Sequence, residues 1–190
     1  RFAEAAVKGF QGDTLSGPFN IAACLKHYVA YGASEAGRDY VYAEVSDQTL
    51  WDTYLPPYEA GVKAGAASIM SSFNLISGVP GSANPYTLTE VLRNQWKWDG
   101  LVVADYAAVD QLVNQHVAPN RKEASKLALE SGVNLDMCDN CYPENLESLV
   151  KEGKLSVATI DNAVKNILRL KFRLGLFEKP YTKELPEKER

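Results

Sequence analysis

The sequence predicts an α/β protein built from parallel βα repeats. Short apolar runs at 21–25, 67–70, 101–104 and 133–135 alternate with stretches whose apolar residues recur at helical spacing. Runs as apolar as these are typical of strands that are buried on both faces, as in parallel sheets. Strands that alternate with helices in this way form right-handed βαβ units.

The length of the chain limits how many such units it contains. About four units fit into 190 residues, whereas a closed barrel of eight units typically needs about 250 residues. We therefore expect either a small doubly wound sheet or half of a TIM-like (β/α)8 barrel. A hydrophobic content of 46% is enough for one core.

Charge and hydropathy exclude two classes of partner. The net charge is only −4, and basic and acidic residues are interspersed. Nucleic-acid-binding proteins and membrane-surface helices carry concentrated basic patches, which this chain lacks. Its apolar runs are also far shorter than a membrane span. We therefore expect neither a nucleic acid nor a membrane as partner, and the sequence leaves the cellular compartment open.

Start and stop signals mark the predicted helices. Ser46 is suited to cap a helix that Pro56 and Pro57 interrupt before it continues to Ala64. Further helices are indicated by apolar spacing over 88–96, over 124–128 ahead of Gly132, over 146–150 behind Pro143 as first helical residue, and over 160–168 ahead of Gly175.

Three cysteines give no clear redox or metal signal. Cys138 and Cys141 form a single Cys-x-x-Cys pair, and Cys24 lies in an apolar strand. A zinc site needs a second ligand pair, and His27 and His116 lack the required spacing. We expect loop cysteines without a catalytic role, a local disulfide being the alternative, and we predict no metal and no cofactor.

Polar side chains follow every predicted strand. Lys26 and His27 follow the first strand, 71–74 the second, Asp105 the third and Asp136 the fourth. In parallel α/β folds, ligands and catalytic groups lie at the carboxyl ends of the strands. Asp105 is therefore the first candidate for a functional carboxylate, the alternative being a helix cap or turn former. We interpret Asp136 as a buttress of its loop.

A series of motifs runs in one order along almost the whole chain: Lys26-His27-Tyr28, Gly37-Arg38-Asp39-Tyr40, Tyr54-Leu55-Pro56-Pro57, 68–74, Gly78-Val79-Pro80, Leu92-Arg93, 100–105, 132–137 and 174–178. In this order the motifs resemble the barrel domain of glycoside hydrolase family 3, of the β-glucosidase type. The resemblance implies that residues 1–177 are the second half of a TIM-like barrel and that 178–190 are a linker toward a C-terminal α/β domain. The first half of the barrel and that domain would belong to the same parent chain or to a second polypeptide.

The resemblance also implies a reaction. Members of this family are retaining, exo-acting hydrolases, which here would release β-linked glucose from the non-reducing end of a β-glucoside or oligosaccharide. Ala104-Asp105-Tyr106 occupies the place of the family's Ser-Asp-Trp motif, so Asp105 is expected to be the nucleophile. The acid/base glutamate of the family lies on the C-terminal domain. The isolated chain is therefore expected to be incomplete as a catalyst.

The same resemblance assigns substrate-binding roles. Lys26, His27 and Arg38 would bind sugar hydroxyls. The remaining expected pocket residues are Met70, Phe73 and Tyr106. Tyr106 stands where the family most often has tryptophan, and Phe73 where it often has tyrosine. Each residue also has a structural interpretation: an ion pair for Lys26 and for Arg38 with Asp39, a satisfied core histidine for His27, and ordinary core packing for Met70 and Phe73.

Other functions are weighed against this one. The N-acetylglucosaminidase branch is disfavoured because the loop 29–38 has no histidine. A β-xylosidase of the same family and a non-catalytic, sugar-binding half-barrel stay as alternatives. A phosphoacceptor receiver domain is disfavoured because Lys26 precedes Asp105 and no acidic pair follows the first strand.

Overall fold

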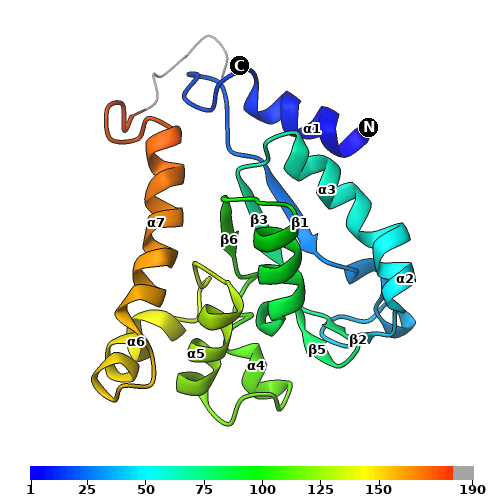
Figure 1. The fold of residues 1–190 in the computed structure, drawn as a ribbon, viewed down its shortest axis with the longest axis vertical. Helices are drawn as coiled ribbons and strands as arrows, with labels where there is room; N and C mark the ends of the chain where they lie inside the picture. Colours follow the sequence, from blue (N-terminus) through cyan, green and yellow to red (C-terminus); the bar gives the residue numbers. More distant parts are fainter. Residues whose placement is uncertain (182–190) are drawn as a thin grey trace, which may run out of the picture.

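The computed structural model describes residues 1–181, in which a parallel sheet is flanked by helices (Figure 1). The strands β1 (Cys24–Tyr28), β3 (Ser68–Ser71) and β6 (Leu101–Val103) lie in the order β1-β3-β6. A parallel bridge between Val103 and Leu135 extends this order by one further position. The prediction of an α/β fold with parallel βα repeats is confirmed.

Each crossover between neighbouring strands is helical. From β1 to β3 the chain runs through α2 (Asp47–Thr49), the π-helical segment Leu50–Tyr54 and α3 (Leu55–Lys63). The π-helical segment Tyr86–Gln95 connects β3 to β6. The other helices are α1 (Phe2–Gln11), α4 (Gln111–Asn114), α5 (Arg121–Ser131), α6 (Cys141–Lys151) and α7 (Val157–Arg173).

A small second sheet joins the loops that follow β1 and β3. Strand β2 (Tyr42–Ala43) pairs in parallel with β4 (Leu75–Ile76), and β4 pairs antiparallel with β5 (Val79–Pro80). The 3-10 turns of the structure are Tyr31–Ala33, Glu35–Gly37 and Gly81–Ala83. Since β4 begins shortly after β3 ends, this sheet fixes the loops at the carboxyl end of the main sheet.

The helix signals are largely confirmed. Ser46 caps α2, its hydroxyl accepting a hydrogen bond from the Thr49 amide at 3.1 Å. The two prolines do not interrupt the helix as expected but lie in the first turn of α3, behind the wider π-helical segment. Proline is tolerated there because its missing N–H is not needed. Pro143 is the third residue of α6 and not its first.

The first strand is shifted relative to the prediction. It begins at Cys24 and not at Ile21, because the Ile21 amide donates to the carbonyl of Phe10 at 3.0 Å and the Ile21 side chain is exposed. Lys26 and His27 therefore lie within β1 and not behind it. The predicted fourth strand reduces to the single bridge at Leu135.

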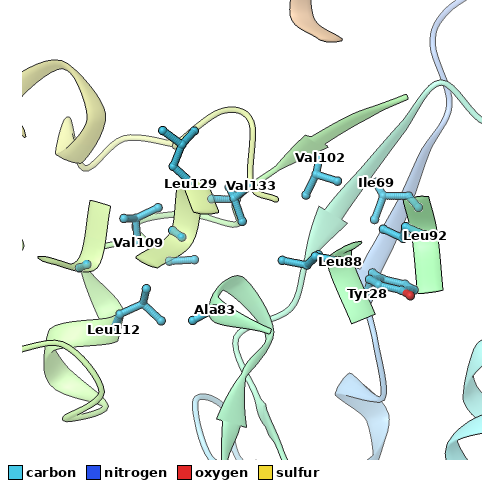
Figure 2. Packing of buried hydrophobic residues seen from close by; sticks show 14 of the residues in the cluster. Tyr28, Ile69, Ala83, Leu88, Leu92, Val102, Val109, Leu112, Leu129 and Val133 are labelled. Carbon is cyan, nitrogen blue, oxygen red and sulfur yellow. The ribbon is translucent and has the colours of Figure 1, made fainter. Parts of the chain in front are cut away.

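The main core lies between the sheet and its crossover helices (Figure 2). Tyr28, Ile69 and Val102, one from each strand, belong to the same buried cluster as Leu88 and Leu92 of the π-helical segment Tyr86–Gln95. The cluster continues beneath the second half of the chain through Val109, Leu112, Leu129 and Val133.

Further predictions concern the thiols, the linker and membranes. The cysteines are free thiols, so the alternative of a local disulfide is not found. Residues 182–190 of the expected linker lie outside the described part of the chain. Among residues 1–181, no helix is both long and apolar enough to span a bilayer.

Candidate active site

His27 and Asp105 meet at the carboxyl end of the main sheet. His27 lies on β1 and Asp105 follows β6, so one strand, β3, separates them. Across that strand, the His27 Nε2 atom approaches the Asp105 Oδ2 atom to 3.3 Å. Asp105 is 9% exposed. The two residues that lead the sequence prediction are therefore brought into direct contact.

The backbone after β6 fixes the orientation of the Asp105 carboxylate. The Tyr106 amide donates to Asp105 Oδ1 at 2.7 Å, and the Ala108 amide donates to the Asp105 carbonyl at 3.0 Å. One carboxylate oxygen is thus held by the main chain, while the other faces His27. A carboxylate held in this way can act as a nucleophile or can stabilise a developing positive charge.

The surroundings of His27 favour its neutral form. Burial lowers the pKa of His27 below its usual 6.5, and the charge of Lys26 lowers it further. The charges of Asp105 and Asp39 act in the opposite direction, but the net shift is downward. At pH 7 the imidazole is therefore neutral, with one N–H available as a hydrogen-bond donor.

Two aromatic rings that the sequence prediction did not assign to the site, those of Tyr31 and Tyr40, lie on the His27 side of this pair. The Tyr31 ring packs edge-on against His27 at 5.1 Å and against Phe73 at 6.2 Å between centroids. The Tyr40 ring lies 4.6 Å from that of Phe73. The Tyr31 hydroxyl donates to Asp39. The sequence offered one signal for these two residues. Tyr31 follows Lys26 and His27 closely, and Asp39 is next to Arg38.

A second tyrosine supports His27 from the crossover helix. The Tyr58 hydroxyl, on α3, donates to the His27 carbonyl at 2.5 Å. Next to it, a cavity of about 510 Å³ is lined by Lys26, His27 and Tyr31 among others, but not by Asp105. The cavity therefore extends the site on the β1 side and does not contain the carboxylate.

Within residues 1–181, the side chains of the remaining predicted residues form no hydrogen bond or ion pair with Asp105, which Tyr106 contacts only through its backbone amide. Met70 is half-buried on β3, in register with Val103 of β6. Arg38 and Tyr106 are exposed. Within residues 1–181, neither Lys26 nor Arg38 forms an ion pair, so the structural interpretations for these two residues find no support. The part of the chain that is described also gathers no group of metal-binding side chains.

Comparison with known proteins gives consistent relatives. Residues 1–170 match the sequence model described as "Glycosyl hydrolase family 3 N terminal domain". A periplasmic beta-glucosidase of Salmonella typhimurium is 35% identical over 179 residues, covering 94% of this chain and 23% of the relative. A beta-xylosidase/alpha-L-arabinofuranosidase of Medicago sativa is 37% identical over 185 residues, covering 94% and 24%.

Solved structures agree with the sequence relatives. The beta-glucosidase of Listeria innocua in complex with isofagomine is 42% identical to this chain, with a TM-score of 0.92. The match covers 95% of this chain and 26% of the Listeria chain. The chain thus spans about a quarter of the length of the relatives it matches. Since the family model covers most of the sequence and the fold agrees, the chain belongs to glycosyl hydrolase family 3 and forms part of the family's TIM-like N-terminal barrel domain.

Proposed function

We propose that this chain carries the nucleophile of a retaining, exo-acting β-glucosidase, with Asp105 in that role. Asp105 attacks the anomeric carbon of a β-glucoside, the bond to the leaving oxygen breaks, and a glycosyl-enzyme ester forms. A separate carboxylic acid protonates the leaving oxygen and then, as a base, activates the water that hydrolyses the ester. That acid is a glutamate on a segment outside this chain.

The observation that carries the proposal is the placement of Asp105. Its carboxylate follows a central parallel strand, is held by the Tyr106 amide at 2.7 Å and faces a histidine at 3.3 Å. Relatives support the substrate class, since the Listeria innocua beta-glucosidase was solved in complex with glucose.

The neighbouring residues complete a site for one glucose unit. The neutral imidazole of His27 and the charges of Lys26 and Arg38 bind its hydroxyl groups. Met70 and Phe73 line the pocket beside the nucleophile, and Tyr106, which is 65% exposed, is free to stack on the leaving group. Residues 1–177 supply this part of a barrel, and 178–190 lead toward the domain that holds the acid.

Replacement of the nucleophile tests the proposal. In the polypeptide that combines this chain with the missing segments, Asp105→Ala is expected to lose at least about 10³-fold in kcat, because the covalent step is removed. Azide, which is small enough to attack from the vacated side, is expected to restore turnover and to give the α-glucosyl azide. Asp99→Ala is the matched control: Asp99 lies at the opposite end of β6, paired with Arg173 at 2.8 Å. Asp99→Ala activity as low as that of Asp105→Ala, or a β-configured azide product, would contradict the proposal.

A β-xylosidase is the second candidate, because relatives with that name match over a similar length. The ratio of kcat/KM for 4-nitrophenyl β-glucoside and β-xyloside separates the two functions. We expect the glucoside to be the better substrate. A non-catalytic sugar-binding module would hydrolyse neither.

A further inference from the structure

The segment that carries Asp105 is joined to the loop after Leu135 at three places. The Ala104 amide donates to the Leu135 carbonyl at 2.8 Å, and the Ala107 amide donates to the Met137 carbonyl at 2.8 Å. The third link joins the Asp110 amide to the Oδ2 atom of Asp139 at 3.0 Å. The first two links join backbone atoms, so most residue types at these positions can form them. Only the third depends on a particular side chain.

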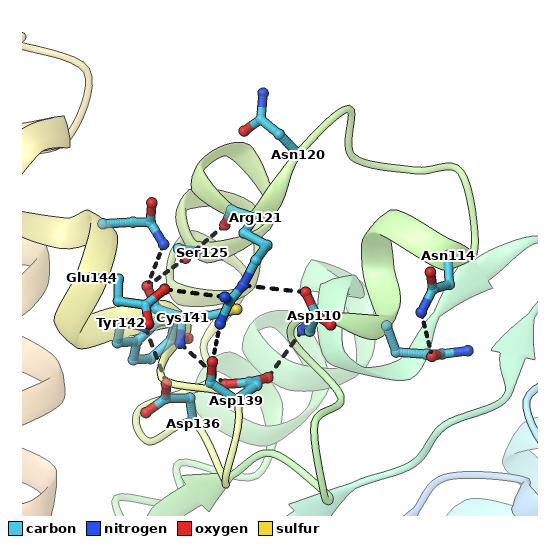
Figure 3. Close-up of polar contacts among 12 residues, drawn as sticks. Asp110, Asn114, Asn120, Arg121, Ser125, Asp136, Asp139, Cys141, Tyr142 and Glu144 are labelled. Atoms are coloured by element: carbon cyan, nitrogen blue, oxygen red, sulfur yellow. Dashed lines mark hydrogen bonds and ion pairs between the residues drawn. The ribbon is translucent and has the colours of Figure 1, made fainter.

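Asp139 is built into this position as a buried acceptor. Its side chain is 8% exposed, and its Oδ1 atom accepts a second hydrogen bond from the Cys141 amide at 3.2 Å. One carboxylate thus joins the nucleophile segment to the start of α6 (Figure 3). A buried carboxylate with two backbone donors has a defined orientation, because loss of either bond leaves a buried polar group unpaired.

Arg121 strengthens the same junction from α5. Its guanidinium donates to the Asp139 carbonyl and lies 3.3 Å from the Asp110 carboxylate and 3.1 Å from that of Glu144 (Figure 3). Positive charge at this place offsets the repulsion between the acidic groups that meet there.

Asp136 lies beside Asp139 but has a different partner. Its Oδ2 atom accepts from the Tyr142 amide at 3.0 Å, which belongs to α6 and not to the nucleophile segment. Burial raises the pKa of Asp136, and the neighbouring Asp139 carboxylate raises it further.

We propose that Asp139 is a positioning residue that sets the direction of attack by Asp105, by anchoring the far end of the segment 105–110 to the loop after Leu135. The inference rests on the proposed function of Asp105. Without this anchor, residues 108–110 keep their own turn bonds and the ion pair between Asp110 and Arg121, but the Asp110 amide loses its acceptor and the Asp105 carboxylate shifts relative to the sugar. A shift of the reacting atoms by about 1 Å can cost about 100-fold in rate while leaving substrate binding largely intact.

A matched pair of isosteric variants tests this role: Asp139→Asn and Asp136→Asn. Both change the contact between Asp136 and Asp139, but only Asp139→Asn removes one of the two acceptor oxygens that join the nucleophile segment to α6. They are compared in the complete polypeptide with an activated 2-deoxy-2-fluoro-β-glucoside, which separates the dissociation constant of the reagent from the rate constant of ester formation. For Asp139→Asn we expect a rate constant lower by about 10- to 100-fold at a nearly unchanged dissociation constant. For Asp136→Asn we expect the parental rate constant.

The outcomes separate positioning from folding. If Asp139→Asn only impairs folding, a smaller fraction of its molecules is labelled, at the parental rate constant. That result would overturn the inference. Equal changes of the rate constant in both variants would overturn it as well. Absence of any adduct on Asp105 in the parental protein would overturn the proposed function and the inference with it. If Asp139→Asn does not fold, hydrogen exchange of the Asp110 amide in the parental protein decides: we expect strong protection, and exchange at the rate of a free amide would overturn the anchor.

Discussion

At the scale of single residues, the protonation of His27 depends on its neighbours more than on its type. Burial lowers its pKa below 6.5, whereas the Asp105 charge raises it. The folded protein thus binds fewer protons at His27 than the unfolded chain does. We therefore expect the stability contribution of His27 to be fully present above pH 6.5 and to be lost as the pH falls through the unfolded and then the folded pKa.

An NMR titration of the His27 ring measures this directly. We expect a midpoint below 6.5, and a further decrease in Asp105→Asn, because that variant removes a charge which favours the imidazolium. An unchanged midpoint in Asp105→Asn would show that the contact between the two residues is absent in solution.

The hydroxyl of Tyr31 offers a second test at this scale. Tyr31→Phe removes the hydrogen bond to Asp39, whereas Tyr40→Phe removes a hydroxyl that has no hydrogen-bond partner within residues 1–181. We expect Tyr31→Phe to lower the free energy of unfolding by about 1 kcal/mol and Tyr40→Phe to change it by less than about 0.5 kcal/mol. Chemical denaturation measures both values. Equal effects would contradict the assigned bond.

The sequence predicts the place of Asp105 behind a buried strand but does not predict the contacts of Tyr31, for a physical reason. Asp105 follows a buried strand, and the ends of parallel strands have a fixed meaning in α/β folds. The contacts of Tyr31 with His27, Phe73 and Asp39 depend on the conformation of the loop after β1, which periodicity does not determine.

At the scale of elements, Asn134 joins the start of β6 to the helix that precedes it. Its Oδ1 atom accepts from the Val102 amide at 3.0 Å and from Arg93 at 3.2 Å. The Arg93 guanidinium also donates to the carbonyls of Trp98 and Gly100, at 2.9 and 2.8 Å. The network therefore fixes β6 at the end opposite to Asp105.

Removal of this acceptor is expected to be costly. Asn134→Ala leaves the Val102 amide and part of Arg93 without a partner, so we expect the free energy of unfolding to fall by about 2 kcal/mol. The control is Asn94→Ala, because within residues 1–181 the Asn94 side chain forms a hydrogen bond only with the exposed Glu90. Thermal denaturation compares the variants. A change as small as that of the control would mean that water replaces the Asn134 bonds.

The sequence predicts the type of each helix or strand better than it predicts the residues at which the element begins and ends. The strand at 101–103 is found where its apolar run predicts it, because β3 and the Leu135 position cover both of its edges. The first strand is displaced because the Ile21 amide donates to the carbonyl of Phe10, which belongs to α1 and not to a neighbouring strand. Pattern alone does not reveal such a contact.

At the scale of the whole molecule, residues 1–181 leave apolar surface exposed. Val164, Leu168 and Phe172 recur every four residues on α7 and are 43%, 40% and 61% exposed. Such a stripe favours association. We expect the chain produced alone to associate, and light scattering to give a mass above 20.9 kDa.

Two substitutions, on different faces of α7, test whether the exposed apolar residues cause the association. Leu168→Lys is expected to reduce association, whereas Asn162→Lys, which adds the same charge at an exposed polar position, leaves it unchanged. A chain that is monomeric without any substitution would contradict this interpretation of the exposed stripe.

The fold and the family follow from the sequence because βα alternation and ordered motifs are properties of the whole chain. The composition of the site does not follow to the same extent, since Arg38 and Tyr106 are exposed and, within residues 1–181, their side chains form no hydrogen bond or ion pair with Asp105.

The central claim is that Asp105 is the nucleophile, and peptide mass spectrometry after treatment with an activated 2-deoxy-2-fluoro-β-glucoside tests it most directly. The leaving group of this reagent departs without acid assistance, so the first step does not depend on the proposed acid/base glutamate. In the complete polypeptide we predict one sugar adduct, on the peptide that contains Asp105. An adduct on a different residue, or none, would contradict the assignment.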